Sequence, residues 1–215
     1  MAITLYQFAY SPYAAKVRKC LELKRLAFDV IEVPYMDRRD VVRLTGQVVV
    51  PILTDGDLAI ADSPRITAHL DERYPPNLRT QPAAASAFET WSDTIFEDVA
   101  FRIATPVVVT KLAALNGGRA DAPAMYRFVK ERKFGPGCVD AWAATARELI
   151  ARLRTLAAPL AETVAVQPYL LGDTPSLADA AVYGNFYMLE WAMPGWIERA
   201  LPALAGWYAR VHAAT

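Results

Sequence analysis

Strand-like patterns are confined to the first third of the chain, and this limits the possible folds more than any other feature of the sequence. Short segments with alternating apolar residues end near Ile60, whereas alanine-rich stretches with helical apolar spacing run from about Pro82 to the C-terminus. Glycine-rich breaks divide this second part into about five or six expected helices. The sequence therefore predicts an α+β N-terminal domain over 1–78 and an all-α domain over 82–215.

The first part has a clear order of expected elements. Ser11 is suited to cap a helix whose first position is Pro12, and Asp55-Gly56 is typical of a tight hairpin turn. In chain order, the predicted elements are a strand from Ile3 to Phe8, a helix from Ser11-Pro12, a strand from Phe28 to Val33, a hairpin formed by Val48 to Leu53 and Leu58 to Ile60, and a helix from Asp62 to Tyr74.

Composition narrows the functional classes. The 23 basic and 23 acidic residues balance, and the basic ones are scattered, which argues against a nucleic-acid partner. Cys20 and Cys138 lack metal or disulfide spacing, so we expect two reduced thiols and no metal. Neither a leader in Met1 to Tyr10 nor a run of roughly 18 uncharged apolar residues is found, so we expect a cytoplasmic protein without a membrane partner.

Three short motifs suggest a specific family. They are Ser11-Pro12-Tyr13-Ala14, Val50-Pro51 and Asp62-Ser63, and further matches are Val17-Arg18, Asp55-Gly56, Glu72-Arg73-Tyr74-Pro75 and Ser176-Leu177-Ala178-Asp179. As an ordered set they resemble the glutathione transferase superfamily over nearly the whole chain. The resemblance implies a thioredoxin-like glutathione-binding domain followed by a helical domain that carries an electrophile site. It also implies a homodimer and a role in detoxification, with glutathione as co-substrate.

The resemblance implies five contacts to glutathione. Ser63 opens a helix, whose N-terminus suits the γ-glutamyl carboxylate, and Asp62 suits the neighbouring ammonium. Val50, before a cis Pro51, would pair its backbone with the cysteinyl unit as an added strand. Gln47 is the nearest match for the donor to the glycine carboxylate. Without the resemblance, a capping Ser63, a first-turn acid and a trans proline would be the ordinary interpretations.

Ser11 is the predicted catalytic residue. It and Ala14 replace the two cysteines found at these positions in glutaredoxin-like relatives, so disulfide exchange through a protein thiol is not expected. A hydrogen bond to a charged group contributes roughly 1.5–3 kcal/mol, enough to lower the pKa of the glutathione thiol by about one to two units. Gln7 falls near the place of the activating tyrosine in tyrosine-type transferases, but Tyr6 and Tyr10 are alternatives.

The resemblance places the electrophile between the domains. Tyr10, Tyr13, Phe96 and Phe101 are the predicted lining residues, although an aromatic stripe on a helix is more often core. Two other features have a structural interpretation. Ser176 and Asp179 form a capping box, whose aspartate we expect in the helical core. The charge run Lys130-Glu131-Arg132-Lys133 is typical of a solvated helix face.

The leading functional hypothesis is therefore glutathione transfer to a small hydrophobic electrophile. Glutathione-dependent isomerisation, peroxide reduction and dehalogenation begin from the same thiolate and are alternatives on the same fold. A different class is a non-catalytic module that binds hydrophobic ligands or protein partners. Retention of Ser11, Pro51, Asp62 and Ser63 favours an enzyme.

Overall fold

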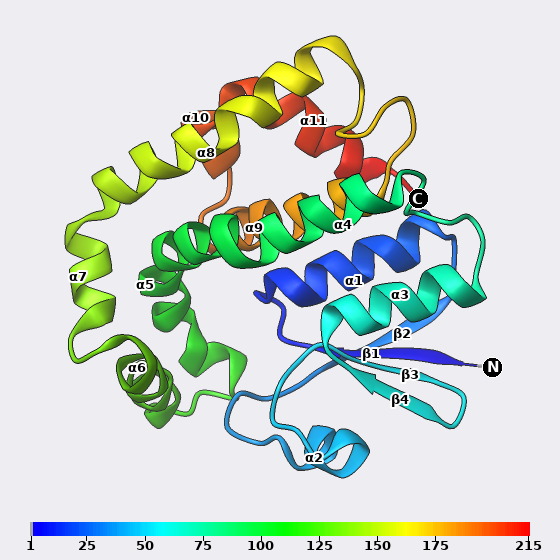
Figure 1. Cartoon of the computed structure of the whole chain (residues 1–215). Helices are drawn as coiled ribbons and strands as arrows, with labels where there is room; N and C mark the ends of the chain where they lie inside the picture. The colour runs from blue at the N-terminus through cyan, green and yellow to red at the C-terminus, as the bar shows by residue number, and fades with distance from the viewer. Residues whose placement is uncertain (1) are drawn as a thin grey trace.

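A four-stranded mixed sheet forms the N-terminal part of the computed structural model, which describes residues 2–215 (Figure 1). The strands are β1 (Ile3–Gln7), β2 (Phe28–Glu32), β3 (Ile52–Asp55) and β4 (Leu58–Ala61), in the order β2-β1-β3-β4. β1 pairs in parallel with β2 and antiparallel with β3. Its alternation buries Ile3 and Leu5 on one face, as the sequence pattern predicts.

Two helices cover one face of this sheet, and a third lies on the opposite side (Figure 1). Helices α1 (Pro12–Leu23) and α3 (Ser63–Arg73) begin where the Ser-Pro signals predict them. Helix α2 (Arg39–Thr45) was not predicted, because only Val41 of its seven residues is buried and no apolar stripe marks it. The strand expected from Val48 begins at Ile52 instead, since Val48 and Val49 are exposed.

The rest of the chain is helical. It contains α4 (Pro82–Trp91), the short π-helix η1 (Ser92–Phe96), α5 (Glu97–Leu115), α6 (Asp121–Phe134), α7 (Cys138–Ala144), α8 (Ala146–Val166), α9 (Leu177–Ala192), α10 (Trp196–Ala200) and α11 (Pro202–Ala213). The described chain thus has more helices here than the five or six expected. Pro106 and Pro159 lie inside α5 and α8 without dividing them.

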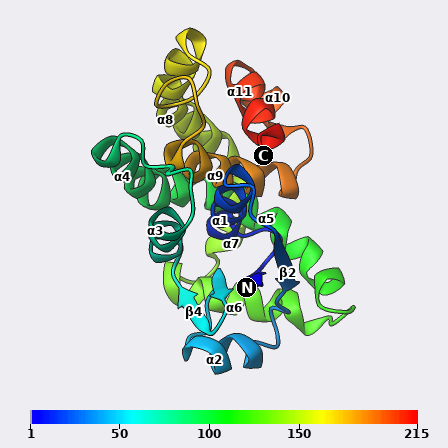
Figure 2. The same ribbon diagram turned by 90° about the vertical axis from the view of Figure 1, so that its right-hand side faces the viewer.

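Helix α9 is the buried centre of the helical part and packs along α1 (Figure 2). The two helices approach closely at Gly184, where a Cβ atom built on the backbone would lie 2.3 Å from the carbonyl oxygen of Pro12. Only hydrogen fits between these two backbones. The glycine therefore joins the helical part directly to the first turn of α1, next to Ser11.

We expect Gly184→Ala to destabilise the protein by about 1–3 kcal/mol, because the methyl group forces α1 and α9 apart. Chemical denaturation measures the change. Gly206→Ala is the matched control, since the nearest atom to its added Cβ is the flexible end of Arg210 at 3.7 Å. That substitution adds helix propensity and should be neutral or stabilising by up to ~1 kcal/mol. Equal stabilities of the two variants would contradict the close-packing explanation.

The start of α9 is held by the predicted capping box. The Asp179 carboxylate is fully buried and accepts hydrogen bonds from the backbone N–H of Ser176 at 3.0 Å and its hydroxyl at 2.8 Å. It also accepts from Leu170 N and Trp207 Nε1, both at 2.9 Å. One side chain thus ties together α9, the preceding loop and α11, which confirms the core position expected for Asp179.

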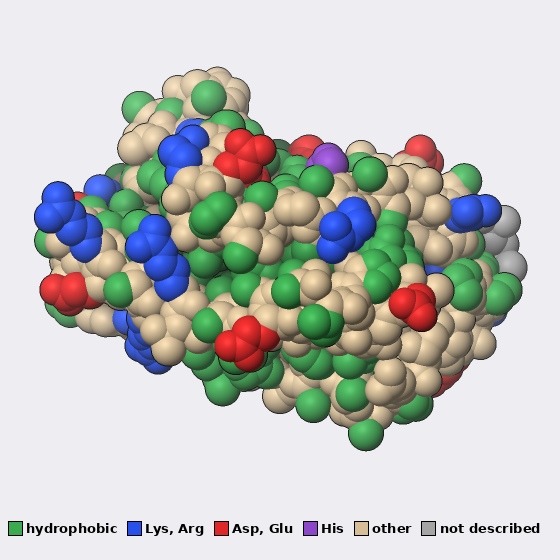
Figure 3. Space-filling model, turned by 90° about the horizontal axis from the view of Figure 1, so that it is seen from above, with side chains coloured by type: hydrophobic (Ala, Val, Ile, Leu, Met, Phe, Trp, Pro, Cys, Tyr) green, Lys and Arg blue, Asp and Glu red, His purple; other side chains and the backbone are tan. Residues whose placement is uncertain are grey.

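The surface and the cysteines also follow the sequence analysis. Figure 3 shows basic and acidic side chains interspersed among apolar ones on one face of the molecule. Cys20 and Cys138 are buried and free, and burial raises the pKa of the Cys20 thiol to about 12. Within residues 2–215, none of the helices combines the length and apolar character needed to cross a membrane.

Candidate functional site

The five predicted glutathione-binding residues meet in one depression, here called the polar cleft. Gln47, Val50, Pro51, Asp62 and Ser63 all line it. They come from two separate segments, the loop before β3 and the start of α3. The remaining lining residues are Tyr13, Val49, Pro64 and Asp93. Residues that the sequence analysis could group only through the family resemblance thus line the same cleft.

The Val50-Pro51 peptide bond is cis, as expected from the resemblance. Val50 precedes β3, and neither its N–H nor its C=O forms a hydrogen bond with another residue in the described chain. Its side chain is half-buried while Pro51 is buried. An extended peptide lying in the cleft can therefore pair with a free strand-like backbone position.

Asp62 and Ser63 form the N-terminal end of α3 at the other side of the cleft. Asp62 occupies the N-cap position but makes no capping hydrogen bond, and Ser63 is already helical and is 3% exposed. The ordinary capping role considered for this pair is therefore absent. Asp62 has a φ of 81°, a conformation that costs a non-glycine residue about 1–3 kcal/mol and that concentrates at functional sites.

Asp93 also lines the polar cleft, and no sequence signal identified it. It lies in η1 and accepts a hydrogen bond at 2.5 Å from Lys16, which also contacts Glu89 at 3.0 Å. The hydroxyl of Tyr13 donates to the backbone oxygen of Asp93 at 3.2 Å. Burial raises the pKa of the Asp93 carboxyl, and the Lys16 ammonium opposes this shift. The buried lysine therefore fixes an acid at the edge of the cleft.

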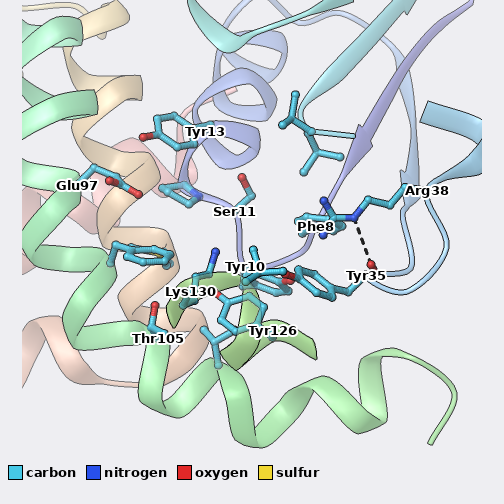
Figure 4. A pocket seen from close by; sticks show the side chains of 17 residues that line it. Phe8, Tyr10, Ser11, Tyr13, Tyr35, Arg38, Glu97, Thr105, Tyr126 and Lys130 are labelled. Atoms are coloured by element: carbon cyan, nitrogen blue, oxygen red, sulfur yellow. Dashed lines mark hydrogen bonds between the residues drawn. The ribbon is translucent and has the colours of Figure 1, made fainter. Parts of the chain in front are cut away.

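A second depression, here called the aromatic pocket, adjoins the polar cleft and shares Tyr13, Val49 and Val50 with it. Three of the four predicted electrophile-lining residues, Tyr10, Tyr13 and Phe101, line it (Figure 4). The other lining residues are Phe8, Ser11, Pro12, Tyr35, Arg38, Glu97, Thr105, Val108, Tyr126, Val129, Lys130 and Met188. The pocket is therefore built from both parts of the chain.

Ser11 lines the aromatic pocket, which shares Tyr13, Val49 and Val50 with the polar cleft. It is the N-cap of α1, where its Oγ accepts a hydrogen bond from Ala14 N at 3.3 Å. Figure 4 shows its hydroxyl pointing into the pocket, with Tyr13 on one side and Phe8 on the other. The hydroxyl proton is not used by the capping bond, because the oxygen acts there as acceptor. Ser11 can thus cap the helix and donate to a ligand simultaneously.

The alternative activating residues are less well placed. Tyr6 lines neither depression and packs with the apolar residues on the α2 side of the sheet. Tyr10 lines the pocket, but its hydroxyl is buried without a hydrogen-bond partner in the described chain. Burial raises the pKa of Tyr10 far above its ordinary value. Gln7 is buried and donates to Glu32 at 2.5 Å.

Phe96, the fourth predicted lining residue, is not part of the pocket wall. Its side chain is fully buried and packs against Trp91 and Phe186 at ring-centroid distances of 5.2 and 5.5 Å. Phe96 ends η1, where the backbone widens to π-helical bonding. Its side chain therefore faces the helical core, whereas Phe101 faces the pocket.

Three charged side chains line the pocket, and the prediction for one of them, Lys130, is wrong. Lys130 was expected on a solvated face, but it is half-buried, with Nζ 4.5 Å from the Tyr126 ring centroid and 4.9 Å from that of Phe101. Arg38 stacks on Tyr35 with its Cζ 4.4 Å from the ring centroid. Burial raises the pKa of the Glu97 carboxyl to about 7. The rest of the run, Glu131 to Lys133, lines neither depression.

In comparisons with known proteins, both parts of the chain match the same protein family. Residues 5–78 match the model of the glutathione S-transferase N-terminal domain, and residues 136–210 match that of the glutathione S-transferase C-terminal domain. The probable glutathione S-transferase GSTU6 of Oryza sativa subsp. japonica is 26% identical over 211 residues, which cover 94% of this chain and 81% of the rice protein.

Solved structures have the same fold. A glutathione S-transferase of Ceriporiopsis subvermispora, in complex with glutathione, aligns with a TM-score of 0.79 and 22% identity, over 99% of this chain and 97% of that one. A glutathione S-transferase of Rhodospirillum rubrum aligns with a TM-score of 0.71 and 24% identity, over 98% and 88% of the two chains. The combination of a thioredoxin-like sheet with a following helical part thus also occurs in these solved structures.

Proposed function

The chain belongs to the glutathione transferase family, and from that premise we propose that it binds glutathione in the polar cleft and activates its thiol for attack on a small hydrophobic electrophile. The observation that carries the proposal is the meeting of all five candidate binding residues in one cleft, which adjoins the pocket lined by Ser11. In this proposal 1–78 is the glutathione-binding domain, and 82–215 supplies the opposite wall for the electrophile.

Each end of glutathione has a suitable partner in the cleft. The γ-glutamyl carboxylate lies at the α3 N-terminus and accepts hydrogen bonds there, where Ser63 adds a hydroxyl. The neighbouring ammonium binds the Asp62 carboxylate, which forms no capping bond. The cysteinyl backbone pairs with Val50, and Gln47, which is exposed at the rim, donates to the glycine carboxylate. The thiol is then directed towards the junction with the aromatic pocket.

Ser11 stabilises the thiolate in this arrangement. Its hydroxyl donates to sulfur, and the positive end of the α1 dipole adds to the effect. Loss of the thiol proton to solvent leaves a thiolate whose lone pair forms the new bond to the electrophilic carbon, while the leaving group departs with its bonding electrons. The protein contributes mainly by positioning the sulfur and stabilising its charge.

Titration calorimetry with glutathione tests the binding part. We expect Asp62→Asn to weaken binding about tenfold or more, because the ammonium loses a charged hydrogen-bond partner worth roughly 1.5–3 kcal/mol. Asp57→Asn is the control, since Asp57 is an exposed acid in the turn between β3 and β4 and lines no part of the cleft. A folded wild-type protein without millimolar or tighter affinity would refute the proposal.

A turnover screen distinguishes the reactions that begin from the same thiolate. Aryl halides test transfer, hydroperoxides test reduction, and cis-trans isomer pairs test isomerisation. Glutathione binding without turnover on any of them would favour the non-catalytic module. Homodimerisation, expected from the family resemblance, is part of the same proposal and is tested by sedimentation.

A further inference from the structure

The aromatic pocket contains a lysine that forms no ion pair with any acid of the described residues. Lys130 points into it from α6 (Figure 4), and its ammonium contacts only the faces of Tyr126 and Phe101. Within residues 2–215, Lys130 forms neither a hydrogen bond nor an ion pair. A half-buried ammonium in such a setting lacks the hydrogen-bond acceptors it would have in water.

The other charged groups of the pocket do not remove this imbalance. Arg38, on the other side, is held by the backbone oxygens of Tyr35 and Val48, so it retains its positive charge. Glu97 is the only acid among the described residues that line the pocket, so it can balance at most one of the two basic side chains; burial raises the pKa of its carboxyl to about 7, which Lys133 and Lys130 oppose. Burial and the nearby Lys133 lower the pKa of Lys130 to about 8, so most of it is still charged at pH 7. The wall is therefore net positive.

The remaining surface of the pocket is suited to a flat ring. Phe8, Tyr35, Tyr126 and Phe101 present aromatic faces or edges around the cavity, and Ser11 opens onto the same space (Figure 4). Aromatic side chains favour offset stacking with another ring. A ligand that combines a ring with an anionic group would use both features of this wall.

We propose that the second substrate is an aromatic electrophile that carries a carboxylate or similar anionic group, and that Lys130 is the residue that selects it. This inference rests on the proposed glutathione-dependent function. The anion accepts a hydrogen bond from the Lys130 ammonium, and the ring occupies the space between the aromatic side chains of the pocket, with its electrophilic carbon towards the thiolate at Ser11. For an aryl chloride, the sulfur–carbon bond forms, the carbon–chlorine bond breaks, and chloride leaves with the electron pair.

A matched pair of substrates tests the selection. Chlorodinitrobenzene and its carboxylate analogue chlorodinitrobenzoate undergo the same displacement but differ in charge. We expect Lys130→Met to lower kcat/KM for the carboxylate about tenfold or more relative to its effect on kcat/KM for the neutral substrate, equivalent to about 1.4 kcal/mol. Lys130→Arg should retain most of the preference. Arg132→Met removes one positive charge from an exposed position of the same helix and should alter neither value.

A binding measurement separates this inference from the proposed reaction. Calorimetry with the unreactive pair dinitrobenzoate and dinitrobenzene should show tighter binding of the anion to the wild type, and the difference should disappear in Lys130→Met. That result supports the inference even if neither chloride is turned over, in which case the proposed reaction fails. Equal losses for both members of either pair, or a wild type that does not distinguish them, would overturn the role of Lys130.

Discussion

Replacement of Ser11 by alanine is expected to raise the pKa of the bound glutathione thiol by about one to two units. The variant loses one hydrogen bond to a charged sulfur, worth roughly 1.5–3 kcal/mol, and each pKa unit corresponds to about 1.36 kcal/mol. At a pH below both pKa values, the thiolate fraction and the turnover that depends on it should fall about ten- to hundredfold. The affinity for glutathione should stay within severalfold, because Ser11 does not touch either end of the peptide in the proposed arrangement.

Ultraviolet absorbance of the thiolate against pH measures this shift. Tyr10→Phe is the control, because the unpartnered Tyr10 hydroxyl lies in the same pocket and is the alternative donor. Removal of Tyr10's hydroxyl should leave the thiol pKa unchanged. Because Ser11 also caps α1, the alanine variant should lose about 0.5–2 kcal/mol of stability. The pH titrations should therefore be carried out well below the melting temperature of the variant. An unchanged thiol pKa in Ser11→Ala would eliminate Ser11 as the activating group.

The second large effect is expected at Asp179. Asp179→Ala should lower the free energy of unfolding by about 3–5 kcal/mol, because it leaves four donors without their acceptor and opens a cavity between α9 and α11. Urea denaturation measures the loss. Asp173→Ala is the matched control, since Asp173 is an exposed acid in the same loop and should change stability by less than ~0.5 kcal/mol.

Asp179 also tests whether stability and binding are separate. Glutathione affinity of the Asp179→Ala variant, measured where it is still folded, should match the wild type because Asp179 lines neither depression. A loss of affinity larger than the loss of stability would contradict a purely structural role.

The sequence predicted those elements whose signals are local. β1, the turn between β3 and β4 and the starts of α1 and α3 each combine periodicity with a turn or capping residue, and each forms where predicted, whereas β3 begins four residues later than predicted. The cleft residues could not be brought together by such reasoning. Gln47 and Asp62 are neighbours only because of the fold, so the family resemblance was needed to relate them.

The errors have physical causes as well. Helix α2 buries a single side chain, so its sequence carries almost no periodic signal. Phe96 is predicted to line the pocket because it lies in the same long helical segment as Phe101, but its side chain packs into the helical core against Trp91 and Phe186. Lys130 has the sequence environment of a solvated lysine, and only the approach of α5 to α6 encloses it. In each case the missing information is tertiary.

The absence of a side chain at Gly184 has a consequence for how a ligand enters. Because α1 and α9 meet backbone to backbone, the two parts of the molecule are locked against pivoting at that point. This contact opposes a hinge motion between the two parts, so we expect ligand access to depend on local movement at the rim of the cleft. The segment around α2 and Gln47, with little buried surface to restrain it, is the part free to provide that movement.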